Sequence, residues 1–289
     1  SIATVLLVVL AALIHATWNL LAKRAADVGA AFVFAYTLLG CMVYAPWVTW
    51  ILWRDGMPWS MPVLLCIGLS GVLHLGYNLS LQRGYQVADL SVVYPVARGT
   101  GPAVATVGAI VLLGEPAGIN ALIGVAAVVI GIVMIAARGR WVHFRQSQAM
   151  AGVRWGAASG LLIAGYSVVD AYGVKVLLVA PVVLDWCAHM VRLGLMLPWT
   201  VTQHQYTVQA MRGYWWLALL VGTLSPLSYI LVLAALSEGA PLSVVAPVRE
   251  MSMMMGAVLA VVILHEPMDR GRLAGCLLLT VGVVLLVLS

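Results

Sequence analysis

The chain has 289 residues, of which 63% are hydrophobic and only 9% are Asp, Glu, Lys or Arg, against roughly 25% charged residues in a soluble domain. So few charges cannot cover a water-exposed surface, which excludes a soluble enzyme, a disordered chain and a nucleic-acid-binding protein. The net charge of +5 does not change this, because most basic residues lie between apolar runs, where they orient membrane proteins. The composition predicts a polytopic helical membrane protein.

Ten apolar runs are long enough to cross a bilayer, which takes about 20 residues as a helix. They are residues 2–22, 31–53, 62–82, 88–113, 118–137, 153–178, 181–201, 214–236, 241–264 and 271–288. The runs are continuous, whereas barrel strands would be shorter and would alternate in polarity. The expected fold is therefore an all-α integral membrane protein with ten transmembrane helices.

The connections between these runs differ in charge. Counted after each span, the odd-numbered connections hold ten Lys and Arg residues, and the even-numbered ones hold only Arg54 and Lys175. The positive-inside rule therefore places the odd connections in the cytoplasm and both termini outside. The four cysteines lie inside apolar runs without metal-ligand spacing, so we expect small core residues, with no disulfide, metal or other cofactor.

The first and third spans carry polar and aromatic residues at depths where lipid-facing residues are apolar. Span one contains Trp18 and Asn19, and Trp18 lies deeper than an interfacial anchor would. Span three places His74, Tyr77 and Asn78 at i, i+3 and i+4, which is one helical face. This face predicts a water-filled or substrate-lined wall, with hydrogen bonding between helices as the alternative.

The fourth span places Tyr94 and Arg98 on one face of a helix interrupted by Pro95. Broken helices are tolerated where they line a cavity. An arginine stays charged, so Arg98 needs an anionic partner. That partner is either a substrate carboxylate or a fixed group, such as Glu250, Asp170 or a helix end, and both interpretations stay open.

The second half of the chain supplies the candidate carboxylates. Span six contains Tyr166 and Asp170, span eight contains Tyr229, and span nine contains Glu250. Ionisable groups inside a membrane are functional candidates by default. Asp170, Glu250 or His74 could couple transport to a proton, and a facilitator without coupling is equally compatible with the sequence.

Two other groups of charged residues favour structural roles. Asp185, His189 and Arg192 of span seven have i, i+4 and i+7 spacing, which indicates a charge stripe that pairs within one helix. Glu115 and Glu266 each precede a proline in a turn. We expect both glutamates to cap helices or support turns.

The second half of the chain repeats the first. Residues 88–98 have the sequence ADLSVVYPVAR and residues 240–249 have the sequence APLSVVAPVR, and each segment is followed after seventeen residues by Glu-Pro. Glycines then match, Gly124 and Gly131 against Gly275 and Gly282. Each half, 1–145 and 146–289, has five predicted spans. An odd number inverts the second half, as in many secondary transporters with a binding site near the midplane.

With residues 15–23, HATWNLLAK, these paired segments and Glu-Pro turns resemble the drug/metabolite transporter superfamily, of the EamA type, over essentially the whole chain. The resemblance implies a basket of helices, with spans one, three, four, six, eight and nine around a central cavity. Relatives carry amino acids, sugars, nucleotide sugars and other metabolites. Within the family the sequence is most similar to bacterial amino-acid exporters, which implies a multi-pass protein of the bacterial inner membrane.

The intramembrane residues suggest what is carried. Arg98 supplies a cation, Asp170 and Glu250 supply anions, and aromatic rings supply apolar faces, which together match a zwitterion with an apolar side chain. We expect export of amino acids, preferably apolar or aromatic, by alternating access. The candidate substrate-binding residues are Trp18, Asn19, His74, Tyr77, Asn78, Tyr94, Arg98, Tyr166, Asp170, Tyr229 and Glu250.

Other functions stay open. The same chemistry would suit a sugar, a nucleotide conjugate or a cationic drug as substrate. A membrane-embedded enzyme or a channel is a remote alternative, because the sequence has no HExxH, GxSxG or filter-like repeat. The expected partners are a small-molecule substrate and the lipid bilayer, without nucleic acid. A monomer suits this interpretation, and the oligomeric state stays open because small-residue stripes pack within or between chains.

Overall fold

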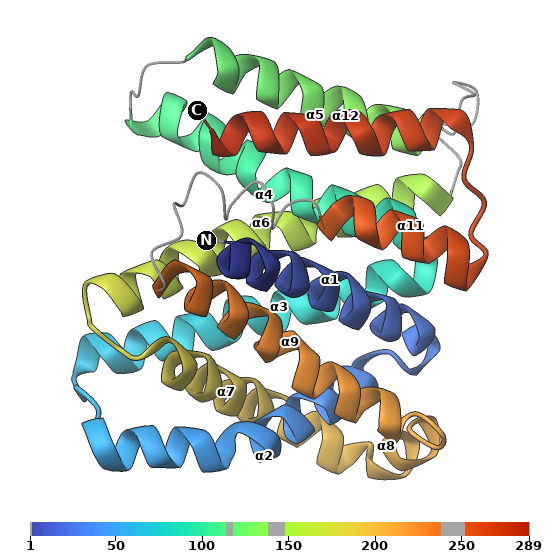
Figure 1. Ribbon diagram of the computed structural model, residues 1–289. Helices are drawn as coiled ribbons and strands as arrows, with labels where there is room; N and C mark the ends of the chain where they lie inside the picture. The colour runs from blue at the N-terminus through green and yellow to red at the C-terminus, as the bar shows by residue number, and fades with distance from the viewer. Residues whose placement is uncertain (1, 114–117, 138–147, 238–251, 289) are drawn as a thin grey trace.

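The computed structural model describes residues 2–113, 118–137, 148–237 and 252–288, which form helices joined by turns, without a strand among them (Figure 1). The helices are α1 (Ile2–Arg24), α2 (Ala30–Asp55), α3 (Met61–Val87), α4 (Leu90–Leu113), α5 (Ile119–Ala137), α6 (Gln148–Lys175), α7 (Pro181–Thr202), α8 (His204–Ala210), α9 (Trp215–Ser237), α11 (Ser252–Leu264) and α12 (Arg270–Val287), with a 3-10 turn η1 (Ala26–Val28). The all-helical class is confirmed for these residues.

Each of the ten predicted spans contains a helix, and the ninth is described only from Ser252 onward. By length and apolar composition, four of the described helices can cross a membrane alone, namely α2, α3, α6 and α12. The bent pair α8 and α9, with 89° between them, makes a fifth if it counts as one span. The fold is thus that of a multi-pass membrane protein, and the count of ten spans remains a prediction.

The apolar runs leave leucine and valine side chains on the outside of the bundle. On α3, the side chains of Leu64, Leu65, Leu69 and Val72 are half or more exposed. Such a face suits hydrocarbon, because it would be an unusually large apolar patch in water. Three of the cysteines, Cys41, Cys66 and Cys276, are buried, as expected for core residues, and Cys187 is partly exposed.

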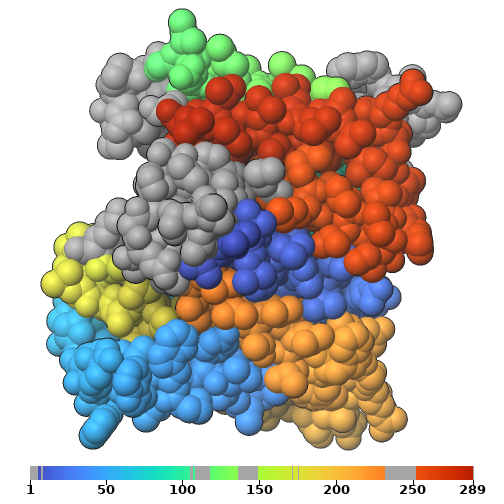
Figure 2. Space-filling model, in the orientation of Figure 1, coloured from blue at the N-terminus to red at the C-terminus, as the bar shows by residue number. Residues whose placement is uncertain are grey.

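The helices form a layered bundle in which α5 and α12 lie side by side at one edge and α2, α7 and α8 lie at the other (Figure 1). Contacts between helices occur in matched pairs. The contact of α3 with α6 matches that of α9 with α1. The contact of α4 with α6 matches that of α11 with α1, and the contact of α2 with α9 matches that of α7 with α3. Figure 2 shows α1 at the surface between α9 and α11.

The glycines that match between the two halves lie at the contact of α5 with α12. A Cβ at Gly131 would lie 2.8 Å from the carbonyl oxygen of Gly275, and a Cβ at Gly275 would lie 2.8 Å from that of Gly131. A Cβ at Gly282 would likewise lie 2.8 Å from the carbonyl oxygen of Gly124. The two backbones are therefore in direct contact, which only a residue without a side chain allows.

Hydrogen bonds close the end of the bundle that carries Lys23 and Arg272, which we call the basic end. The carboxylate of Glu266 accepts hydrogen bonds from the backbone N–H of Leu90 at 2.8 Å and of Ser91 at 3.0 Å. These are orphan donors at the start of α4, which an anionic cap satisfies and stabilises. The expectation that Glu266 supports a turn or a cap is confirmed, and Glu115 lies outside the described residues.

Basic residues that the charge count assigns to loops are partly buried in this closure. Lys23 of α1 donates to the carbonyl oxygens of Tyr85 at 2.6 Å and Ala88 at 2.5 Å. The side chain of Arg272 is 1% exposed and pairs with Asp89 at 2.9 Å. Lys23 therefore ties α1 to the end of α3, and Arg272 ties α12 to the turn before α4, in addition to any effect on orientation.

Candidate functional site

A cavity of about 180 Å³ lies inside the bundle, between α1, α3, α4, α6, α7 and α9. It has room for a small organic solute, since a single water needs only about 10–15 Å³. Five of the six helices expected around a central cavity line it. The sixth, α11, does not line it in its described part, and α7 does so unexpectedly.

Most of the predicted site residues meet at this cavity. Its lining includes Trp18, His74, Tyr77, Asn78, Arg98, Tyr166, Asp170 and Tyr229. Glu250 lies outside the described residues. Asn19 and Tyr94 are described, and the lining includes neither of them.

Asn19 joins two helices, α1 and α3. Its side chain is fully buried, its Nδ2 donates to the carbonyl oxygen of His15 at 2.8 Å, and its Oδ1 accepts from the hydroxyl of Tyr85 at 2.6 Å. The amide thus bonds within α1 and across to α3. This is the interhelical hydrogen bonding of a membrane bundle, and in this structure Asn19 lies outside the cavity lining.

Tyr94 is a core residue, with 1% of its surface exposed. A Cβ at Gly256 of α11 would lie 2.5 Å from its ring, and the ring centroid is 6.0 Å from that of His15. The ring therefore fills the space between α4, α11 and α1. Sharing a helical face with Arg98 was not enough to predict that Tyr94 lines the cavity. The small residue Gly256 on α11 leaves room for the tyrosine ring between the helices instead.

The carboxylate of Asp170 is held by Ser70 and lies near His74, both residues of α3. The hydroxyl of Ser70 donates to Oδ1 at 2.5 Å, and Nε2 of His74 lies 3.7 Å from Oδ2. No Lys or Arg of the described chain pairs with Asp170. A carboxylate accepts several hydrogen bonds, so Asp170 keeps acceptor capacity toward the cavity.

Aromatic rings continue the wall from Asp170. The ring of Tyr166 stacks on the imidazole of His74, with centroids 3.8 Å apart and planes 21° apart, and its centroid lies 5.6 Å from that of Tyr77. Stacked and tilted rings of this kind present flat apolar faces and attract cations. The wall formed by α3 and α6 thus carries an acid beside aromatic surface.

The opposite wall comes from α1 and α9. The indole N–H of Trp18 donates to Nδ1 of His15 at 3.3 Å, and the same nitrogen lies 3.5 Å from the hydroxyl of Ser228. His15 and Ser228 line the cavity although neither is among the predicted residues. The spacing of His15 three residues before Trp18, which puts both on one helical face, is the signal that could have found His15.

The charge stripe of α7 also lines the cavity. Asp185 lies 3.5 Å from Nδ1 of His189 and 3.8 Å from Arg192. The expected pairing within the helix is therefore present. All three residues nevertheless contribute to the cavity lining, so the interpretation as a purely structural stripe was incomplete. The spacing of residues within α7 does not indicate which other helices pack against it.

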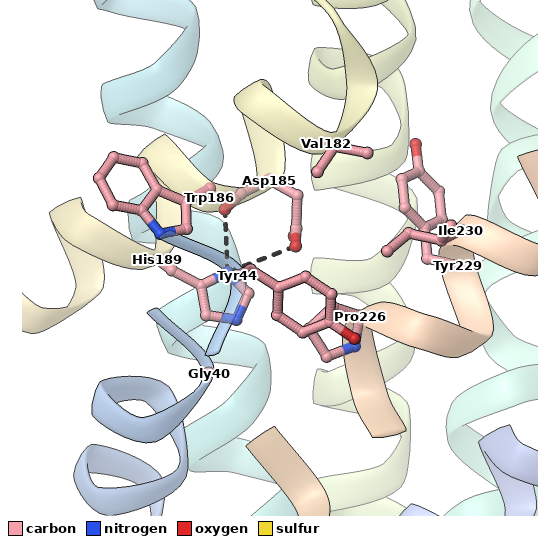
Figure 3. Close-up of a pocket in the computed structure, with 9 residues that line it drawn as sticks. All are labelled: Gly40, Tyr44, Val182, Asp185, Trp186, His189, Pro226, Tyr229 and Ile230. Atoms are coloured by element: carbon pink, nitrogen blue, oxygen red, sulfur yellow. Dashed lines mark hydrogen bonds and ion pairs between the residues drawn. The ribbon is translucent and has the colours of Figure 1, made fainter. Parts of the chain in front are cut away.

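A smaller pocket adjoins the cavity between α2, α7 and α9 (Figure 3). Asp185, His189, Pro226 and Tyr229 line both. Figure 3 shows Trp186 and Tyr229 on opposite sides of the Asp185 carboxylate. The indole N–H of Trp186 donates to the carbonyl oxygen of Cys41 at 3.0 Å and so ties α7 to α2.

The fold and cavity define a class, a multi-pass helical membrane protein with a polar, aromatic-lined cavity of the size of a small solute. Comparison with protein families then gives a particular match: residues 2–137 are similar to the EamA-like transporter family. A comparison with curated proteins gives no significant match.

Among solved structures, one titled only "Crystal structure of protein" aligns with 98% of this chain and 96% of its own, at a TM-score of 0.52 and 16% sequence identity. That likeness extends over the whole chain, and at this identity it shows a shared fold.

Proposed function

We propose that this protein is a secondary transporter that exports amino acids, preferably apolar or aromatic ones, across the bacterial inner membrane. The EamA-like domain over residues 2–137 supports a membrane transporter of small solutes. The resemblance of the whole sequence to bacterial amino-acid exporters of this family supports the substrate class.

One observation carries the substrate proposal. Asp170 lines the cavity without a Lys or Arg partner in the described chain, beside the stacked rings of His74 and Tyr166. A carboxylate next to aromatic faces suits an ammonium group attached to an apolar body. Arg98 lines the same cavity and supplies positive charge for a carboxylate. The two charges and the rings together match a zwitterion.

Alternating access is the mechanism that we propose, by rocking of two inverted five-helix repeats. The matched contacts, such as α3 with α6 and α9 with α1, support a twofold arrangement. The closure by Glu266 and Lys23 supports a state in which the basic end is shut. The charge asymmetry of the connections supports a cytoplasmic location for this end, and export would then require these contacts to open and reform.

The test is flux of radiolabelled amino acids in proteoliposomes of the purified protein, with and without a pH gradient. Saturable flux that accelerates with amino acid on the far side would support a carrier, because a channel gives no trans-stimulation. A response to the gradient would establish proton coupling, and its absence would favour a facilitator. Folded protein that moves no amino acid would reject the substrate class and direct attention to sugars, nucleotide conjugates and cationic drugs.

A further inference from the structure

One polar side chain in the cavity lacks a partner of its own. Asn78 of α3 is 7% exposed and lines the cavity, and its Nδ2 has no hydrogen-bond partner among the described residues. Leaving a buried amide donor unsatisfied costs about 1–3 kcal/mol. Native structures keep few such groups, and each calls for an explanation. Since this donor lines a solute-sized cavity, a bound acceptor group would explain it.

We propose that Asn78 is a specificity-determining residue, whose amide N–H groups bind the carboxylate of the transported amino acid. The proposal rests on the proposed function, and it assigns the two ends of the substrate to two places on the α3–α6 wall. The ammonium lies at Asp170, and the carboxylate lies at Asn78.

The spacing of the two groups fits an α-amino acid. Oδ2 of Asp170 lies 3.7 Å from Nε2 of His74. His74 comes one helical turn, about 6 Å, before Asn78 on α3. The nitrogen and carboxyl carbon of an α-amino acid are about 2.5 Å apart. With a hydrogen bond of about 2.8 Å at each end, the zwitterion spans about 8 Å. One molecule can therefore reach both groups, with its side chain against the aromatic rings.

The surroundings of Asn78 favour an anionic acceptor. Two contacts of α6 relate the depth of α4 to that of α3. A Cβ at Gly160 of α6 would lie 2.7 Å from the carbonyl oxygen of Ala97 in α4. Two residues further along α6, Leu162 packs against α3 at the position two residues before Asn78. Arg98 of α4 is therefore at a depth similar to that of Asn78, and both line the cavity. The positive charge of Arg98 makes this end attractive to a carboxylate and unattractive to an ammonium.

The experiment compares two ligands that differ only at the carboxylate. Binding of phenylalanine and of phenethylamine, which lacks the carboxylate, is measured by calorimetry on the purified full-length protein in detergent. The variants are Asn78→Leu, which removes the donors, and Asn78→Asp, which keeps the shape and adds a negative charge. Asn120→Leu is the matched control, because Asn120 is exposed on α5.

Asn78→Leu should weaken phenylalanine binding roughly tenfold to a hundredfold, the usual effect of losing a hydrogen bond to a charged group, and leave phenethylamine within about twofold. Asn78→Asp should weaken phenylalanine further and leave the amine unchanged or tighter, and Asn120→Leu should change neither. Equal weakening of both ligands, or no change in either, would overturn the assignment. If the wild type binds neither ligand, it is the proposed function that fails. If Asn78→Leu does not fold, the near-isosteric Asn78→Asp decides alone.

Discussion

The hydroxyl of Ser70 donates a hydrogen bond of 2.5 Å to the carboxylate of Asp170, and so joins α3 to α6 at the wall of the cavity. The bond orients one carboxylate oxygen and leaves the other near His74, at 3.7 Å. A carboxylate held in this way is preorganised for a cation, because its position is fixed before the ligand arrives.

Replacing Asp170 by Asn should separate this structural bond from the binding of a cation. The amide oxygen can still accept from Ser70, but it offers no charge to an ammonium group. We expect KM for the transported amino acid to rise roughly tenfold or more, the loss of one charge-assisted bond, with an unfolding temperature close to that of the wild type. The measurement is initial flux in proteoliposomes against substrate concentration.

Asp55→Asn is the control for that experiment. Asp55 is exposed at the end of α2 and pairs with its neighbour Arg54 at 2.6 Å. Exposed pairs contribute little to stability, so this variant should transport like the wild type. An unchanged KM in Asp170→Asn would remove Asp170 from the ammonium site, and an unchanged KM in Arg98→Ala would remove Arg98 from the site.

The cap that Glu266 provides to α4 should contribute measurably to stability. In Glu266→Ala the N–H groups of Leu90 and Ser91 lose their acceptor, and loss of a helix cap costs about 0.5–2 kcal/mol. We expect the unfolding temperature in detergent to fall by a few degrees. Glu266→Gln keeps an acceptor oxygen and should lie between the wild type and Glu266→Ala. Equal stability of all three proteins would show that the cap contributes nothing.

The contact of α5 with α12 predicts opposite effects for the same substitution at two glycines. In Gly131→Ala the new methyl group would meet the backbone of Gly275 at 2.8 Å, and forcing packed helices apart costs about 1–3 kcal/mol. In Gly68→Ala nothing lies within 4 Å of the new methyl group. Since alanine is favoured in a helix by about 0.5–1 kcal/mol, this variant should be as stable as the wild type or more so. Thermal unfolding in detergent decides, and a stable Gly131→Ala would contradict the close packing.

The helices were predictable because their apolar runs are long, and part of the cavity was predictable because His74, Tyr77 and Asn78 share one face of α3. Periodicity reports which residues share a face and says nothing of the helix that this face meets. Asp185 is followed by His189 four residues later and by Arg192 seven residues later, which is the pattern of ion pairs within one helix. Only the packing of α7 beside α2 and α3 places it at the cavity.

The same limit explains Asn19, a predicted binding residue that instead links α1 to α3 through the hydroxyl of Tyr85 at 2.6 Å. In Asn19→Ala this buried hydroxyl loses its acceptor, which should lower the free energy of unfolding by about 1–3 kcal/mol while KM stays within about twofold of the wild type. Tyr85→Phe removes the other partner and should have a similar effect. Because the two side chains form one bond, the double variant should lose less than the two single variants together. A raised KM with unchanged stability in Asn19→Ala would return Asn19 to the substrate site, since a residue that acts only through packing changes stability first.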